Sequence, residues 1–453
     1  MNHTMKITLP EDVRKIIDTI ENAGFEAYAV GGCIRDSLLG RTPDDWDITT
    51  SAKPEQVKAL FRRTIDTGIA HGTVTVMLNR VGYEVTTYRI DGEYEDSRHP
   101  KEVIFTGSLR EDLRRRDFTI NALAYNDRVG LVDEFHGLED LDRKILRAVG
   151  NPAERFEEDA LRIMRAVRFS AQLGYEIEEG TKQAIGALAG NLTHISAERI
   201  QVELIKLVKS LHPEKMRDLY ELGITKVFMP EFDAIMETTQ HNPHHKYTVG
   251  EHTIHAMMAI EADKNLRLAM LFHDFGKALC KTTDEKGIDH FHGHAVQSEA
   301  LCKKILRRLK FDNDTTHLVS ALVLYHDYRV EPGKKYVRRA VNRIGEEVFP
   351  LLLKVQQADL DAQSDYKKEE KQQRLDAVTA LYEEILTDQE CVSLRTLAVK
   401  GGDLIAWGMK PGKEIGEMLA RLLETVLEDP KNNQKEKLHE YYLKYLDETA
   451  VKK

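Results

Sequence analysis

The stretch AYAVGGCIRDSLLGRTPDDWDITT, residues 27–50, carries most of the information about the N-terminal fold. AYAV predicts a strand, Gly31 and Gly32 predict a tight turn, and a short amphipathic helix is expected over 33–39. A strand, a glycine turn and a helix N-terminus form a cradle for an anion, because bare amides point at the ligand and no Cβ blocks its approach. Arg35, in the first turn of that helix, can add a charge-assisted contact to a phosphate.

Two aspartates near the end of the same stretch indicate a metal site. Asp45 and Asp47 flank Trp46 in DWDITT, which is predicted to be a strand, so both side chains should point to one side. Neighbouring carboxylates repel each other unless a divalent cation lies between them, and hard oxygen ligands favour Mg²⁺. Glu84, in the predicted strand GYEVTTYR, would complete the set. Two Mg²⁺ ions about 4 Å apart would activate a hydroxyl nucleophile and stabilise the leaving oxygen. The alternative is a solvated strand face.

A second charged stretch, EEDALRIMRAVRF at 157–169, has the composition of an amphipathic helix, with no glycine or proline to interrupt it. Asp159, Arg162, Arg165 and Arg168 follow one another at intervals of three residues. Each therefore sits about 60° back from its predecessor around the helix. One interpretation is a solvated face with weak acid–arginine pairs. The other is a curved row of hydrogen-bonding groups aimed at a ligand.

The totals describe an ordered protein of several domains. The chain has 453 residues, 31% of them charged and 42% hydrophobic, so about two to four domains are expected. The net charge of −10 argues against a uniformly basic nucleic-acid surface, although LREDLRRRDF at 109–118 is locally basic. Four cysteines without a CxxC pair indicate a reducing compartment and no cysteine metal site. With no apolar run long enough to span a bilayer, we expect a cytoplasmic protein that does not contact a membrane.

Hydrophobic periodicity changes near residue 150. Before it, short runs rich in valine, isoleucine, tyrosine and threonine predict strands; after it, the pattern is helical to the end. We therefore predict an α+β fold, with a mixed-sheet head followed by all-helical parts. The predicted strands are EAYAV, WDITT, TVTVML, YEVTTYRI, EVIFT and LVDEF. The predicted domains are a catalytic head at 1–147, a neck at 148–212, a body with a metal site at 213–378 and a tail at 379–453.

Three motifs in order resemble a known family. GGCIRDSLLGRTPDDWDITT, then RRRDFTINALAYN at 114–126, then RFEEDALRIMRAVRF at 155–169 are similar to motifs of class II tRNA nucleotidyltransferases and the related bacterial poly(A) polymerases. The resemblance resumes over 392–419 with the C-terminal part of the CCA-adding enzymes. It implies a nucleotidyltransferase that adds C, C and A to the 3′ end of tRNA from CTP and ATP, with release of pyrophosphate. No protein partner is implied.

The resemblance also assigns roles to residues. Asp45, Asp47 and Glu84 would be the catalytic carboxylates, the first two binding Mg²⁺. Asp159 and Arg162 would present an acceptor and a donor to the Watson–Crick edge of the incoming base, as a pairing nucleotide does. Cytosine and adenine both offer an amine beside an acceptor, so one pair can select both and reject U and G. The implied nucleotide-binding residues are Gly31, Gly32, Arg35, Arg116, Asp117, Asn121, Asp159, Arg162, Arg165 and Arg168.

The resemblance leaves open which nucleotides are added. In this family, a flexible loop where DGEYEDSRHPKEVIF (91–105) stands helps to switch from CTP to ATP, and its presence favours CCA or CC addition over addition of A alone. The rivals are a poly(A) polymerase and an enzyme adding only CC or only A. Glycine-rich turns over 401–416 are implied to contact tRNA, the alternative being ordinary helix packing.

Histidines concentrate between residues 241 and 294, in a pattern that resembles the HD metal-dependent phosphohydrolase domain. The implied ligands are His252, His273, Asp274 and Asp327, with His294 as an additional candidate. Imidazole and carboxylate ligands suit several divalent metals, so the metal is not identified. One or two ions would activate water against a phosphodiester. The alternatives are a helical body with a vestigial site, and, for the whole chain, an HD phosphohydrolase whose head only senses nucleotides.

Overall fold

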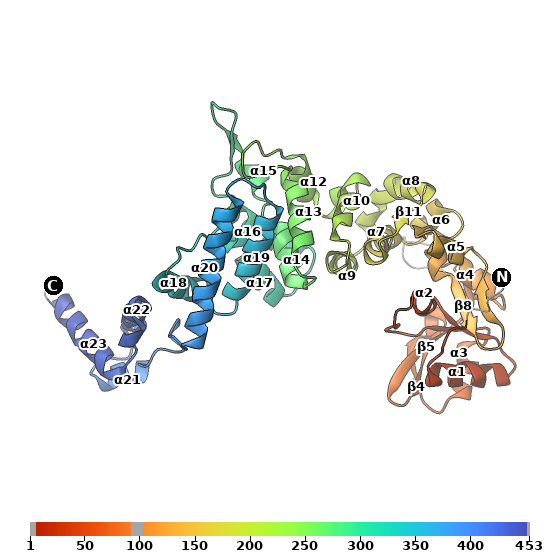
Figure 1. Ribbon diagram of the computed structural model, residues 1–453. Coiled ribbons are helices and arrows are strands. Elements are labelled where there is room, and N and C mark those ends of the chain that lie inside the picture. The colour runs from red at the N-terminus through yellow and green to blue at the C-terminus, as the bar shows by residue number, and fades with distance from the viewer. Residues whose placement is uncertain (1–5, 92–102, 451–453) are drawn as a thin grey trace. The chain divides into compact units, whose positions relative to one another are not determined.

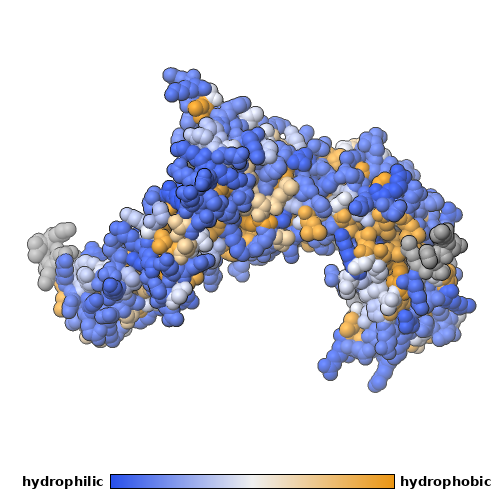
Figure 2. Space-filling view, viewed as in Figure 1, coloured by the Kyte–Doolittle hydropathy of each residue, from blue (hydrophilic) through white to orange (hydrophobic). Residues whose placement is uncertain are grey.

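The computed structural model describes residues 6–91 and 103–450 and divides into two compact units, Met1–Pro230 and Glu231–Lys453 (Figure 1). Most of the predicted switching loop, residues 92–102, lies outside the described part of the chain. On the face drawn in Figure 2, hydrophilic side chains cover most of each unit. No helix among the described residues is long and apolar enough to cross a membrane.

The first unit begins with a seven-stranded sheet in the order β3-β4-β5-β2-β1-β8-β9. The pairing of β2 with β5 is parallel and the other neighbours are antiparallel, which confirms the mixed-sheet head. Each of the six predicted runs contains a strand, whereas β3 and β8 were not predicted. The strands are β1 (Ala27–Val30), β2 (Ile48–Thr50), β3 (Thr64–Gly68), β4 (Thr73–Leu78), β5 (Val81–Thr87), β8 (Leu123–Asn126) and β9 (Gly130–Asp133), with a separate hairpin of β6 (Arg89–Asp91) and β7 (Val103–Phe105).

Amphipathic helices accompany this sheet. In α1 (Glu11–Asn22), Val13, Ile16, Ile17 and Ile20 recur at helical spacing and are fully buried, so one face of the helix builds the core. The other head helices are α2 (Gly32–Leu38), α3 (Pro54–Leu60), α4 (Leu109–Arg114) and α5 (Gly137–Asp142). The prediction of a strand through DWDITT was partly wrong, because β2 begins only at Ile48.

A helical segment completes the first unit and extends past the predicted end of the neck at residue 212. Its elements are α6 (Pro152–Glu158), α7 (Leu161–Leu173), α8 (Glu179–Leu188), α9 (Ala197–Val208), α10 (Met216–Glu221) and α11 (Thr225–Phe228), with a short parallel pair, β10 (Ile145–Leu146) and β11 (Glu176–Ile177). The prediction of one continuous helix over 157–169 was wrong. Asp159 has extended backbone angles, φ −141° and ψ 102°, between α6 and α7. Its Oδ1 accepts a hydrogen bond from the Leu161 amide at 3.0 Å, a local bond of the kind that competes with helix continuation.

The second unit is helical apart from a two-residue pair, β12 (Thr282–Thr283) and β13 (Asp289–His290). The predicted boundary at 378/379 falls inside α20, so the helix continues across it. Its helices are α12 (Pro230–Glu237), α13 (Val249–Ala259), α14 (Lys264–Phe272), α15 (Lys277–Cys280), α16 (His294–Arg308), α17 (Asn313–Tyr325), α18 (Lys334–Ile344), α19 (Phe349–Ala362), α20 (Lys368–Thr387), α21 (Gly401–Ala406), α22 (Lys413–Glu428) and α23 (Lys435–Ala450).

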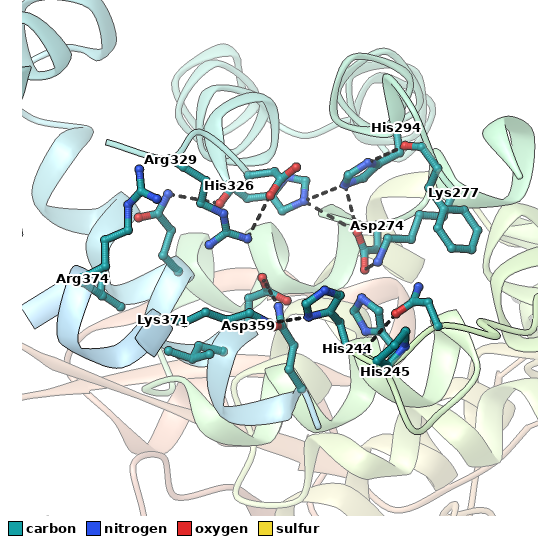
Figure 3. Close-up of a pocket in the computed structure, with 18 of the residues that line it drawn as sticks. His244, His245, Asp274, Lys277, His294, His326, Arg329, Asp359, Lys371 and Arg374 are labelled. Atoms are coloured by element: carbon teal, nitrogen blue, oxygen red, sulfur yellow. Dashed lines mark hydrogen bonds and ion pairs between the residues drawn. The ribbon is translucent and has the colours of Figure 1, made fainter. Parts of the chain in front are cut away.

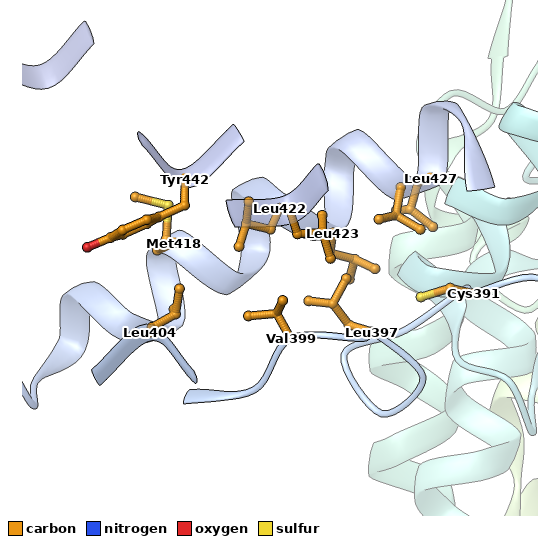
Figure 4. Packing of buried hydrophobic residues seen from close by; sticks show 11 residues of the cluster. Cys391, Leu397, Val399, Leu404, Met418, Leu422, Leu423, Leu427 and Tyr442 are labelled. Atoms are coloured by element: carbon orange, nitrogen blue, oxygen red, sulfur yellow. The ribbon is translucent and has the colours of Figure 1, made fainter. Parts of the chain in front are cut away.

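The three C-terminal helices share an apolar core (Figure 4). Arg338 on α18 joins this core to the preceding helices, because its guanidinium donates to the backbone oxygens of Leu427 and Glu428 at 2.8 and 2.9 Å. These carbonyls end α22 and have no partner within that helix. The buried residues of the core are Cys391, Leu397, Val399, Leu404, Met418, Leu422, Leu423, Val426, Leu427, Leu438 and Tyr442.

Candidate functional site

Three carboxylates of the head lie close enough to affect one another. The parallel register pairs Ile48 with Val85, so Asp47, one residue earlier, stands at the level of Glu84. Protein atoms packed around Asp47 raise its pKa; the charge of Arg116 lowers it and that of Asp45 raises it. Desolvation also raises the pKa of Glu84, and the charges of Asp47 and Asp45 add to the rise. Mutual repulsion of this kind favours a divalent cation among the oxygens, and the donor set fits Mg²⁺.

The glycine turn beside these carboxylates requires glycine at its first position. Gly31 has φ 87°, a left-handed conformation, and a Cβ added there would lie 2.9 Å from Nη1 of Arg116. The turn leads directly into α2, which begins at Gly32. Burial lowers the pKa of Arg116, whereas the charge of Asp112 raises it, and the Arg116 Nε finds no hydrogen-bond partner among the described residues. A buried arginine with an unsatisfied donor beside a bare turn is suited to an anionic ligand.

A chain of hydrogen bonds joins the head to the neck. Arg35 donates from Nη1 to Oδ1 of Asn121 at 2.7 Å, and Asn121 donates to Oδ1 of Asp117 at 3.1 Å. The other Asp117 oxygen accepts from Nε and Nη2 of Arg165 at 2.8 and 2.6 Å. Burial alone would raise the pKa of Asp117, but the charge of Arg165 and the Asn121 bond hold it well below its usual range. The structure therefore brings these four predicted residues together as an internal clamp.

Asp159 and Arg162 bond to different partners. The Asp159 Oδ2 accepts from Nη2 of Arg199 on α9 at 2.8 Å. Arg162 donates from Nη1 to Glu158 at 2.6 Å and from Nη2 to the backbone oxygen of Arg115 at 2.8 Å. Arg162 therefore reaches the head, whereas Asp159 is tied to the neck. Sequence reasoning missed Arg199, since nothing in its local sequence distinguishes it.

Arg168 has an internal role in the structure. It is buried, and it donates from Nε to Oε2 of Glu203 at 2.8 Å and from Nη1 to Gln172 at 2.8 Å. Its guanidinium also lies 3.5 Å from the centre of the Phe169 ring. These contacts occupy Arg168 within the neck, and its burial differs from the solvated face of the first interpretation.

In the second unit, two groups of metal-ligand type share one aspartate. The ligand atoms of His252, His273 and Asp274 lie within 4.8 Å of one another. So do those of Asp274, His294 and His326, which Figure 3 shows. Asp274 Oδ2 lies 3.6 Å from His252 and 3.3 Å from His273, while Oδ1 lies 3.5 Å from His294 and 3.6 Å from His326. One carboxylate therefore faces two imidazole pairs.

The histidine tautomers suit metal binding. Nδ1 of His273, His294 and His326 lies 2.6, 2.9 and 2.7 Å from a backbone carbonyl. A carbonyl only accepts, so each Nδ1 carries the proton and Nε2 presents a lone pair to the group. Within the first group, Nε2 of His252 and His273 lie 3.3 Å apart, and within the second, those of His294 and His326 lie 3.2 Å apart. The residues present fit one or two divalent cations.

The structure does not bring Asp327 to this cluster. Its side chain is about half exposed and bonds to Arg329 at 2.9 Å. Asp359 on α19 stands there instead, with its Oδ1 2.9 Å from Nε2 of His252. Of the predicted pair His326–Asp327, the histidine faces the cluster. The sequence signal that could have identified Asp359 was an aspartate on an otherwise apolar helix face.

A cavity of about 880 Å³ opens onto the cluster. Lys277, Arg329, Lys371 and Arg374 are among the residues that line it (Figure 3). Lys277 lies 2.7 Å from Oδ2 of Asp274 and donates to Gln240 at 2.9 Å. Cations around a metal-type cluster suit a phosphate-bearing ligand.

Three family descriptions match consecutive parts of the chain. They are the poly A polymerase head domain at 27–147, the probable RNA and SrmB-binding site of polymerase A at 174–236, and the putative tRNA nucleotidyltransferase domain 2 at 281–442. The chain is also 38% identical over 433 residues to the CCA-adding enzyme of Limosilactobacillus fermentum, covering 94% of this chain and 95% of that protein. The chain belongs to the CCA-adding enzyme family.

Other relatives agree. The CCA-adding enzyme of Anoxybacillus flavithermus is 36% identical over 429 residues, covering 94% of this chain and 95% of that one. The crystal structure of the Bacillus stearothermophilus CCA-adding enzyme in complex with CTP matches with a TM-score of 0.73 and 28% identity, over 100% of both chains. These findings confirm the predicted family and fold class. The HD-type cluster rests on its own geometry.

Proposed function

We propose that Asp45, Asp47 and Glu84 form the reaction centre at which this CCA-adding enzyme adds C, C and A to the 3′ end of tRNA. CTP and ATP are the donors, and pyrophosphate leaves as the RNA 3′-hydroxyl attacks the α-phosphate. The observation that carries the assignment is the register that sets Asp47 level with Glu84, beside the Gly31 turn. Bound Mg²⁺ supplies the charge that activates the hydroxyl and stabilises the leaving oxygen.

The chain's own groups bind and orient the nucleotide. The backbone amides at Gly32 and the unsatisfied Nε of Arg116 suit the triphosphate. Asp117 and Asn121 hold Arg35 and Arg165 in place, so we assign them to support of the triphosphate site. No covalent intermediate is required, because positioning and charge accelerate phosphoryl transfer.

Asp159 and Arg162 are proposed to select the base. A carboxylate accepts from the exocyclic amine of cytosine or adenine, and a guanidinium donates to the neighbouring ring nitrogen or carbonyl. Each carboxylate oxygen has two lone pairs, so Asp159 can accept from a base while it remains bonded to Arg199. Uracil and guanine present a carbonyl where an amine is needed, and are rejected.

An extension assay tests this assignment. Purified protein with Mg²⁺ meets tRNA transcripts that end before CCA, after CC, or complete, with each nucleotide alone and with CTP plus ATP. We expect addition of CCA followed by a stop. Asp45→Asn should abolish addition, whereas Asp44→Asn, a neighbouring exposed aspartate, should not. Full activity of Asp45→Asn would refute the reaction centre; long A tails or CC alone would refute complete CCA addition.

We also propose a metal-dependent phosphohydrolase site in the body, in the manner of an HD domain. The carrying observation is that Asp274 faces two histidine pairs, with all four Nε2 atoms 3.3–3.6 Å from its carboxylate oxygens. His252, His273, Asp274 and Asp359 would hold one ion, with His294 and His326 available to a second. Bound metal supplies an activated water for attack on a phosphate ester.

This second activity can be separated from the first. Asp274→Asn should lose bound divalent metal and hydrolysis of bis-p-nitrophenyl phosphate while CCA addition continues, and Asp45→Asn should do the reverse. Wild-type protein that binds no Mn²⁺, Ni²⁺, Zn²⁺ or Mg²⁺ at the cluster would mark it as vestigial. If the wild-type protein extended no RNA but hydrolysed the ester, the rival with a nucleotide-sensing head would be favoured.

The remaining proposals concern organisation. We assign the head to 1–147, the neck to 148–212, the body to 213–378 and the tail to 379–453, with RNA contact at the glycine turns that begin α21 and precede α22. We place the reaction in the cytoplasm; the four free cysteines suit a reducing compartment.

A further inference from the structure

The two carboxylate oxygens of Asp159 bond to different donors, Arg199 of α9 and the backbone amide of Leu161. It lies in the first turn of α9 and donates from Nη2 to Oδ2 of Asp159 at 2.8 Å. The other oxygen accepts from the Leu161 amide at 3.0 Å. Both side chains are mostly buried, with 25% and 21% exposed. Each oxygen therefore has a defined donor, and the plane of the carboxylate is set.

This contact matters because the backbone at Asp159 is not helical. The residue sits in the extended break between α6 and α7, so no ladder of helical hydrogen bonds fixes its side-chain direction. A base-selecting acceptor must be held in place before the base arrives, since a shift of about 1 Å is enough to spoil a pairing geometry. Arg199 and the Leu161 amide supply that restraint.

The face of α9 that carries Arg199 has charges complementary to those of Asp159 and α7. Glu203 stands one turn further along α9, and its Oε2 accepts from Nε of Arg168 at 2.8 Å. The same face of α9 thus presents a cation to Asp159 and an anion to Arg168. Reversed positions would place like charges together, so this pattern fixes the register of α9 against the selecting segment.

Arg199 also keeps unused hydrogen-bonding capacity. It holds Asp159 through one nitrogen, whereas a guanidinium can pair with a carboxylate through two. Its Nη1 is buried and has no hydrogen-bond partner within the described residues. A single bond leaves lone pairs of Asp159 open to an incoming amine, which a two-pronged pair would obstruct.

We propose that Arg199 is a positioning residue for base selection, which orients Asp159 so that cytosine and adenine are accepted and uracil and guanine are refused. This inference rests on the proposed role of Asp159. Arg199 itself is not assigned to the chemistry of transfer, because its bonds are made to Asp159 and not to the head carboxylates.

The test measures kcat and KM for CTP and UTP on tRNA lacking CCA, and for ATP and GTP on tRNA ending in CC. Arg199→Gln should lower the CTP-over-UTP ratio of kcat/KM by about tenfold to a hundredfold, as expected for loss of a charge-assisted hydrogen bond. Arg199→Lys keeps the charge and should retain part of the ratio. Lys206→Gln, an exposed charge on the same helix, is the matched control and should leave the ratio unchanged.

A double-mutant cycle separates the role of Arg199 from the proposed base-selecting role of Asp159 on which it rests. If Asp159→Ala destroys discrimination, Arg199→Gln alone lowers the ratio, and Arg199→Gln adds nothing in the Asp159→Ala background, both hold. If Asp159→Ala destroys discrimination and both Arg199 variants keep the wild-type ratio, Arg199 is not a positioning residue. If Asp159→Ala itself keeps the ratio, the selecting role of Asp159 fails, and this inference with it. An equal loss of kcat with every nucleotide at an unchanged ratio would show a merely structural role and would also overturn it.

Discussion

Replacing Asp117 with asparagine should loosen the clamp between head and neck. Asp117→Asn keeps the shape of the side chain but removes its charge, and it sets an amide nitrogen or a neutral oxygen against Arg165. Wild-type Asp117 accepts two bonds from Arg165 at 2.8 and 2.6 Å and is itself 8% exposed, whereas the Arg165 side chain is 34% exposed. The loss therefore includes two charge-assisted bonds and leaves a guanidinium short of a partner.

The size of the effect follows from these contacts. Removing one member of a buried pair costs about 3–5 kcal/mol, and the partial exposure of Arg165 lowers this to about 2–4 kcal/mol. In a unit of this size, each kcal/mol shifts the melting temperature by about 2–4 °C, so we expect a fall of about 4–16 °C. The pKa of Asp117 is depressed in the folded state, so its contribution is present at neutral pH and is lost as pH falls below its ordinary value of 3.8.

The loss of stability in Asp117→Asn is measured by thermal unfolding at pH 7 and at acidic pH, together with hydrogen exchange of α7. The difference between variant and wild type should be full at pH 7 and should shrink as pH falls below about 4. Asp127→Asn is a control, because it removes an ion pair with Arg14 whose side chains are 33% and 46% exposed, and it should cost less than about 1 kcal/mol. An unchanged melting temperature, or a deficit independent of pH, would contradict the clamp.

Other substitutions examine separate parts of the structure. Gly31→Ala should weaken CTP binding at least about tenfold and cost about 1–3 kcal/mol of stability, because φ is 87° and an arginine fills the space beside it; unchanged CTP affinity in calorimetry would contradict this. Asp359→Asn should lose divalent metal measured by mass spectrometry while Asp327→Asn retains it, and the opposite pattern would restore Asp327 as the ligand. Glu203→Gln should cost about 3–5 kcal/mol by leaving the buried Arg168 without its carboxylate partner, seen as faster hydrogen exchange in α7 and α9; unchanged exchange would exclude that role.

The head was predictable from sequence because its geometry is local. A strand, a glycine turn and a helix within residues 27–38 need only short-range preferences, and all three are present. The D-x-D pattern then indicated the carboxylates, and the register of β2 against β5 sets Asp47 level with Glu84. Local preferences did not predict where β2 begins, because the strand starts after Asp47 rather than before it. β8 was missed as a strand because its run of four residues lies between charged motifs.

The histidine and aspartate cluster of the second unit shows where sequence reasoning stops. His273 and Asp274 are adjacent in the chain, so the pair could be recognised from the sequence. Asp359 joins His252 across 107 positions, and only the packing of α13 against α19 places them together. Sequence could not decide which member of the His326–Asp327 pair turns inward, because at the end of α17 a one-residue step rotates a side chain by about 100°.

The three arginines of α7 are evenly spaced in the sequence, but each contacts a different part of the fold. Successive steps of three residues turn each side chain about 60° back, so Arg162 and Arg168 differ by about 120° around the helix. Arg162 reaches a backbone carbonyl of the head, Arg165 reaches Asp117, and Arg168 reaches α9. One short helix is thereby bonded to the head on one side and to α9 on another. Asp159 stands just outside that helix, so the direction of its carboxylate depends on α9 as much as on α7. The base selection that we propose for Asp159 would therefore depend on the packed neck rather than on the motif alone.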